Sequence, residues 1–86
     1  MRVCIPTPLY SYTGNRAEVE AVGATIEQVT SDLEKNFPGM RFRIIDEQDN
    51  IRPHIKFFLN KEQIFDLITP VEPKDELVII QAFSGG

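Results

Sequence analysis

The sequence of 86 residues has one cysteine, one histidine and no tryptophan. Cys4 has no second thiol with which to form an internal disulfide, so such a cross-link is excluded from the fold. One cysteine and one histidine among scattered acidic residues match no structural zinc spacing, and we expect no metal site. No histidine lies near Cys4 in the sequence, which argues against a catalytic thiol. We expect Cys4 to fill space in a strand and His54 to be a surface or packing residue.

Clustered positive charge and long apolar runs are also scarce. Nine Lys and Arg residues stand against 13 Asp and Glu residues, which gives a net charge of -4. Nucleic-acid phosphates select for clustered positive charge, so we expect no nucleic-acid partner. No apolar run approaches the roughly 20 residues that a membrane-spanning helix needs. With no charged-then-apolar leader either, we expect a cytoplasmic protein without a membrane partner.

The composition that remains describes one ordinary domain with a modest core, since 42% of the residues are hydrophobic and 26% are charged. Its clearest element is a helix within residues 23–39. Thr25 is placed to cap the first turn and Gln28 to complete a capping box, while Pro38 and Gly39 mark the end. The apolar face of this helix would consist of Ile26, Val29, Leu33 and Phe37.

Strand patterns lie on both sides of the helix, and a short second helix is expected within residues 40–46. The strands are expected at residues 1–6, 16–22, 54–60, 63–65 and 77–83, with a turn around Gly14 joining the first two. This order is typical of an α+β domain in which a mixed sheet packs on one main helix. Because the last strand is apolar at consecutive positions, we expect it to be central and parallel to the first. That topology is the ubiquitin-like β-grasp.

Strand alternation then predicts two different sheet faces. The side chains expected to face the helix are Val3, Ile5, Ile55, Phe57, Leu77 and Ile79. Phe58, Val78 and Ile80 would point the other way. An apolar patch of these three side chains would suit a docking surface, with scattered surface hydrophobic residues as the alternative interpretation.

The sequence closes on "AFSGG". At an average glycine usage of about 7%, two consecutive terminal glycines arise by chance in roughly 0.5% of chains. A frayed end or a cloning boundary is one explanation. The other is chemical, because only glycine lets a backbone pass through a narrow channel without a Cβ clash. The terminal carboxylate would then be a substrate that another protein activates, for example as an acyl-adenylate.

Nearly the whole chain resembles the MoaD/ThiS-type sulfur carriers. The resemblance lies in "VCIPTPLYSYTGN", "GATIEQVTSDLEKNFPG", "IKFFLNKEQI" and "KDELVIIQAFSGG". These carriers are ubiquitin-like proteins whose terminal glycine is adenylated by an E1-like enzyme and converted to a thiocarboxylate. The segments "LEKNFPGMRFRIID" and "IRPHIKFFLN" are most similar to the CysO-like branch, which carries sulfur for cysteine biosynthesis.

The resemblance implies a role for each residue near the end of the chain. Gly86 would carry the adenylate and then the thiocarboxylate, and Ser84 and Gly85 would form a flexible lead. The domain would thus span residues 1–83 and the tail residues 84–86. Phe83 would anchor the tail where it leaves the sheet, and Phe58 with Ile80 would form part of the docking face for partners.

The same resemblance implies that the chain is not an enzyme, has no catalytic residue and needs no cofactor, since ATP is used by the activating partner. The implied partners are an E1-like adenylating enzyme, a sulfur donor or sulfurtransferase, and an acceptor synthase. That acceptor would build cysteine or a sulfur-containing cofactor such as molybdopterin or thiamine. Two alternatives stay open at this point. The chain could be a protein modifier conjugated through Gly86, or a ubiquitin-like interaction module whose glycines are incidental.

Overall fold

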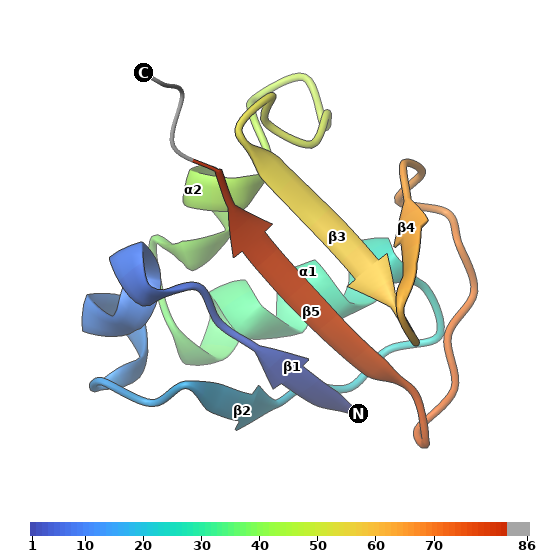
Figure 1. The fold of residues 1–86 in the computed structure, drawn as a ribbon, viewed down its shortest axis with the longest axis horizontal. Coiled ribbons are helices and arrows are strands. Elements are labelled where there is room, and N and C mark those ends of the chain that lie inside the picture. The colour runs from blue at the N-terminus through green and yellow to red at the C-terminus, as the bar shows by residue number, and fades with distance from the viewer. Residues whose placement is uncertain (83–86) are drawn as a thin grey trace.

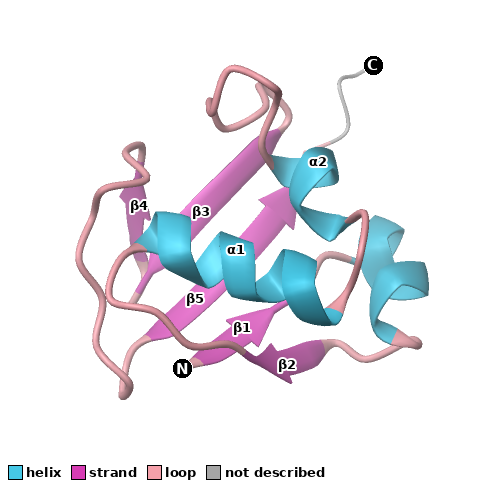
Figure 2. Ribbon diagram, turned by 180° about the vertical axis from the view of Figure 1, so that it is seen from behind, coloured by secondary structure: helices cyan, strands magenta, loops and turns pink. Residues whose placement is uncertain are grey.

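The fold is a five-stranded sheet with its two α-helices packed on one face (Figures 1 and 2). The computed structural model describes residues 1–82. Its strands are β1 (Arg2–Cys4), β2 (Glu18–Glu20), β3 (Ile55–Leu59), β4 (Glu62–Ile64) and β5 (Glu76–Gln81). Its helices are the 3-10 helix η1 (Thr7–Thr13) and the α-helices α1 (Ile26–Asn36) and α2 (Met40–Ile44).

The last strand lies in the centre of the sheet, whose strand order is β2-β1-β5-β3-β4. On one side β5 pairs in parallel with β1, so that Val3 lies opposite Leu77. On the other side it pairs antiparallel with β3, where Phe57 lies opposite Ile79. The α+β class, the ubiquitin-like β-grasp topology and the central position of the last strand are therefore confirmed.

Alternation along the strands separates the core from an outer face. Leu77 and Ile79 of β5 are buried, whereas Ile80 of the same strand is 41% exposed. All six side chains expected to face the helix are buried. Each such side chain contributes about 1.5–3 kcal/mol relative to an exposed position, so this face supplies much of the folding free energy.

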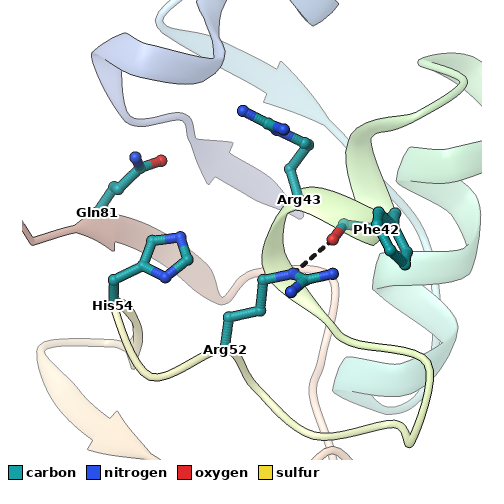
Figure 3. A pocket seen from close by; sticks show the side chains of 5 residues that line it. All are labelled: Phe42, Arg43, Arg52, His54 and Gln81. Atoms are coloured by element: carbon teal, nitrogen blue, oxygen red, sulfur yellow. Dashed lines mark hydrogen bonds between the residues drawn. The ribbon is translucent and has the colours of Figure 1, made fainter.

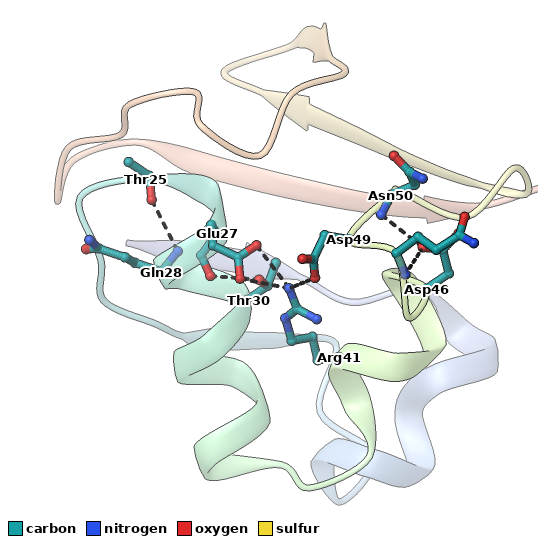
Figure 4. A network of polar contacts seen from close by, with 9 residues as sticks. Thr25, Glu27, Gln28, Thr30, Arg41, Asp46, Asp49 and Asn50 are labelled. Carbon is teal, nitrogen blue, oxygen red and sulfur yellow. Dashed lines mark hydrogen bonds and ion pairs between the residues drawn. The ribbon is translucent and has the colours of Figure 1, made fainter.

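The main helix α1 forms where its capping residues predict it. The Thr25 hydroxyl oxygen accepts a hydrogen bond from the backbone N–H of Gln28 at 3.3 Å (Figure 4). The Gln28 side-chain oxygen reaches back to the N–H of Ala24 at 2.8 Å, one residue earlier than the usual capping box. Val29 and Leu33 are fully buried against the sheet, while Phe37 lies just beyond the helix and is half-buried.

Arg41 connects α1, α2 and the loop before β3. Its guanidinium donates to the Glu27 carboxylate at 2.7 Å and to Asp49 at 3.2 Å (Figure 4). On the same helix pair, the Glu34 carboxylate accepts the backbone N–H groups of Gly39 and Arg41, each at 3.0 Å. These bonds satisfy donors at the start of α2, which the sequence predicted as a short helix.

The connection between the first two strands differs from the expected turn. Residues 7–13 form η1, whose Leu9 and Thr13 are buried, and Gly14 ends it with a left-handed φ of 65°. The Thr13 hydroxyl donates to the Arg16 carbonyl at 2.8 Å and fixes the exit toward β2. The second strand is also shorter than residues 16–22, and Ala17, which precedes it, is exposed.

The capping contact of Thr25 should be measurable as stability. We expect Thr25→Ala to lower the free energy of unfolding by about 1 kcal/mol, because the Gln28 N–H loses its partner. Thr25→Ser retains the hydroxyl oxygen and should keep most of that free energy. Urea denaturation followed by circular dichroism measures both, and equal losses in the two variants would show that the cap contributes nothing.

Candidate functional site

The sheet face away from the helices carries the predicted docking side chains. Cys4 of β1 and Phe58 of β3 both lie opposite Val78 of β5, so the three form a row across the centre of the sheet. In the neighbouring row Ile80 lies opposite Lys56. Cys4, Phe58 and Val78 are half-buried, and Ile80 and Lys56 are exposed. The structure thus places Phe58 and Ile80 on one face, as expected, and their docking role stays a prediction.

Cys4 lies half-buried in this face, in surroundings that disfavour the thiolate form. Burial raises the pKa of its thiol, and the carboxylates of Glu76 and Glu18 raise that pKa further. The thiol therefore stays protonated at neutral pH, and a protonated thiol is a weak nucleophile. This agrees with the expectation of a small filler in a strand.

Opposite charges border the apolar row at the start of β5. The Arg2 guanidinium forms an ion pair with Glu76 and lies 4.0 Å from the Glu18 carboxylate. At the other end of β5, Lys56 has no carboxylate partner within residues 1–82. The outer face is therefore apolar in the centre, paired in charge at one end and cationic at the other.

An apolar groove lies beside the end of β5, where the strand passes η1. Its volume is about 440 Å³, and it is lined by Pro6, Thr7, Pro8, Ile79, Ile80 and Gln81. The two prolines have fixed φ angles, so this wall of the groove is rigid. Because Ile80 borders both the groove and the outer face, the two form one continuous apolar surface.

A cationic pocket lies on the other side of the same strand end (Figure 3). It has a volume of about 300 Å³ and is lined by Phe42, Arg43, Arg52, His54 and Gln81. Sequence reasoning did not identify it, because its residues come from α2, the loop before β3 and β5. The sequence did hold one signal for this pocket. Arg43 lies in the helix expected at 40–46 and His54 begins the strand expected at 54–60, so each element brings a basic residue to the end of β5.

The described chain stays in the sheet up to Ala82, whose backbone N–H donates to the His54 carbonyl at 2.7 Å. The predicted site residues Phe83, Ser84, Gly85 and Gly86 lie outside the described residues. So does the predicted boundary between domain and tail, which stays a prediction. The apolar groove and the cationic pocket thus flank the point from which the sequence continues to Gly86.

Neither a metal site nor a membrane span can be identified among residues 1–82. No group of three or more His, Cys, Asp or Glu side chains in this range could hold a metal ion. Within the same range, every helix is too short or too polar to cross a bilayer.

Comparison with known proteins gives relatives along the full chain. Residues 3–86 match the ThiS family. The sulfur carrier protein CysO of Mycobacterium tuberculosis H37Rv is 34% identical over 89 residues, which cover 98% of this chain and 96% of the relative.

Solved structures agree with this likeness. A chain in the crystal structure of the Amycolatopsis orientalis BexX/CysO complex superimposes with a TM-score of 0.91 at 33% identity, covering 99% of this chain and 98% of its own. The crystal structure of Mycobacterium tuberculosis CysO superimposes with a TM-score of 0.90 at 31% identity, covering 95% of this chain and 98% of its own. Small archaeal modifier protein 1 of Haloferax volcanii shares the fold. It superimposes with a TM-score of 0.78 at 24% identity, covering 99% of this chain and 97% of its own. The chain therefore belongs to the ThiS family.

Proposed function

We propose that this chain is a cytoplasmic sulfur carrier whose Gly86 carboxylate is activated and converted to a thiocarboxylate. The observation that carries the proposal is the 34% identity to the sulfur carrier CysO over 98% of the chain. The Gly85-Gly86 pair lies within the residues matched to the ThiS family, which run to residue 86. The chain itself would act as substrate and carrier, and the catalytic groups would belong to its partners.

The proposed chemistry has two displacement steps. In the first, a carboxylate oxygen of Gly86 attacks the α-phosphorus of ATP, pyrophosphate leaves, and an acyl-adenylate forms. In the second, a sulfur nucleophile at the oxidation level of sulfide attacks the acyl carbon, and AMP leaves as the C–S bond forms. The resulting thiocarboxylate is a nucleophile at neutral pH, so sulfur is passed on without being released as free sulfide.

The described part of the molecule would serve as a rigid support for this chemistry. β5 pairs with β1 through Val78 and with β3 through Gln81, and the Ala82 N–H donates to the His54 carbonyl, so Ala82 has a fixed position relative to the outer face. An activating enzyme that binds Phe58 and Ile80 would therefore hold Ala82, the last described residue, at a fixed distance from its binding surface. Glycine at positions 85 and 86 would let the backbone enter a narrow site without a Cβ clash.

The proposed partners are an E1-like adenylating enzyme, a sulfur donor or sulfurtransferase, and an acceptor synthase. The matched Amycolatopsis structure contains CysO in a complex with BexX, which supports a protein partner for this chain as well. The likeness to CysO favours an acceptor that makes cysteine over one that makes molybdopterin or thiamine.

The first test is intact-mass analysis of the chain after incubation with ATP, a sulfur donor and candidate activating enzymes. We expect a mass increase equal to replacing one oxygen by sulfur, located on the C-terminal peptide. A variant lacking Gly86 is the control and should gain no sulfur, because the reactive carboxylate is displaced by one residue.

Two results would contradict the sulfur-carrier proposal. The first is an unchanged mass with every activating enzyme from the same genome. The second is the appearance of conjugates to lysine side chains with no sulfur-bearing form, which would favour a protein modifier.

The outer face should matter for activation. We expect Ile80→Asp to lower kcat/KM of the activating enzyme at least about tenfold, since an anchoring side chain contributes about 1.4 kcal/mol or more to an interface. Ile68→Asp is a matched control, because Ile68 is 75% exposed and lies in the loop after β4. Adenylation kinetics measure both, and circular dichroism checks folding. Equal kcat/KM for the two variants would exclude Ile80 from the docking face.

A further inference from the structure

We propose that the cationic pocket beside the end of β5 binds carboxylate side chains of the protein that takes up the tail. The inference deepens the proposed function and rests on it for the identity of that protein. It assigns to Arg43 and Arg52 the task of orienting an acidic partner surface next to Ala82, from which the sequence continues to residues 83–86. Neither residue belongs to the apolar outer face of the sheet.

One guanidinium of the pocket is already held in place. Arg52 donates from Nε to the Phe42 carbonyl at 2.6 Å, and its guanidinium carbon lies 4.5 Å from the centre of the Phe42 ring (Figure 3). The two contacts fix the plane of the guanidinium before a partner binds. Binding therefore costs little additional rotamer freedom of this side chain. Phe42 itself is 57% exposed, so this arrangement lies at the surface where a partner can reach it.

The charge of the pocket is not neutralised within residues 1–82. The ion pairs of that range involve the Met1 amino group, Arg2, Arg41 and Lys74, and include neither Arg43 nor Arg52.

Two of the three acids in the loop between α2 and β3 are held by other contacts, and the third, Glu47, forms no ion pair within residues 1–82. Asp49 pairs with Arg41, and the Asp46 carboxylate accepts the N–H groups of Gln48 and Asn50 at 2.9 and 3.0 Å. Within residues 1–82, a protein of net charge -4 thus keeps two arginines without an ion pair at one place.

The position of the two arginines in the fold indicates which protein they would contact. Gln81 forms one wall of the pocket, and the His54 carbonyl accepts the N–H of Ala82, the last described residue. Any protein that receives the residues beyond Ala82 must approach this end of the sheet. At the opposite end, where the chain leads into β5, charges are paired: Glu72 with Lys74 and Glu76 with Arg2. Positive charge without an ion pair at the Ala82 end would orient an incoming acidic surface and raise its association rate.

Carboxylates suit the pocket better than a polyanion does. A guanidinium presents paired N–H donors that match the two oxygens of a carboxylate. Nucleic acid is disfavoured, since two arginines on a protein of net negative charge supply too few phosphate contacts for binding at physiological salt. A small phosphate remains as a competing anion, and a separate titration with inorganic phosphate distinguishes it from a carboxylate.

The direct test is an NMR titration of the ¹⁵N-labelled chain with a blocked tetraglutamate peptide and, separately, with inorganic phosphate. We expect the peptide to shift the amide signals of Arg43, Arg52 and His54, and the double variant R43E/R52E to lose these shifts. K61E/K74E is the control, because it changes the net charge equally in the turn after β3 and in the loop before β5, and both segments lie at the other end of the sheet (Figure 1). Peptide shifts that persist in R43E/R52E, or phosphate binding as tightly as the peptide, would overturn the proposal.

Activation kinetics form the second arm, with the enzyme that the mass analysis identifies. We expect R43E/R52E to lower kcat/KM about tenfold at 0.01 M salt, and the loss to shrink at 0.15 M, where the screening length falls from about 30 to about 8 Å. K61E/K74E should stay within about twofold of the unmodified chain, as surface substitutions away from an interface do. Equal kcat/KM for the two double variants would contradict the pocket's role.

The two arms separate failure of the pocket from failure of the carrier function. If no enzyme activates the unmodified chain, the carrier proposal is wrong, and the peptide titration still decides whether the pocket binds carboxylates. If the chain is activated but R43E/R52E behaves like K61E/K74E in both arms, only the pocket proposal is wrong.

Discussion

The pairing of β5 with a strand on each side is the constraint on which the rest of the molecule depends. It places Val3 and Phe57 beside Leu77 and Ile79, and so assembles the buried layer beneath α1. By alternation, the same pairing sends Ile80 to the outer face. Since the hydrogen bonds continue to Ala82, it also fixes the point from which the chain goes on to Gly86. The buried core, the outer face and the position of Ala82 all follow from one strand register.

Much of the fold could be predicted because its signals are local. Consecutive apolar residues from Leu77 to Ile80 indicate a central strand, and Thr25 with Gln28 marks the start of α1. The helix η1 could not be predicted in this way. Pro6 and Pro8 stop a strand but do not specify the next element, and η1 is held by tertiary burial of Leu9. Local patterns predict elements well only where local and tertiary preferences coincide.

The same distinction between local signals and tertiary contacts applies to the candidate site. Phe58 and Ile80 could be placed on one face from strand alternation alone, since one register assigns every side chain of a strand. The cationic pocket could not, because Arg43 and Arg52 stand in segments without periodicity and meet only when α2 and β3 reach the same end of the sheet. Local patterns do not specify how α2 and the loop before β3 are placed relative to each other. The apolar half of the site was thus predictable and the charged half was not.

The central claim is that Gly86 carries sulfur. Tandem mass spectrometry of the C-terminal peptide, from protein isolated from its own cells and alkylated on extraction, tests it most directly. We expect an alkylated thiocarboxylate on Gly86 in a fraction of the molecules, and none after sulfur starvation. Gly86 found only as a free carboxylate, or only in amide linkage to lysine side chains, would contradict it.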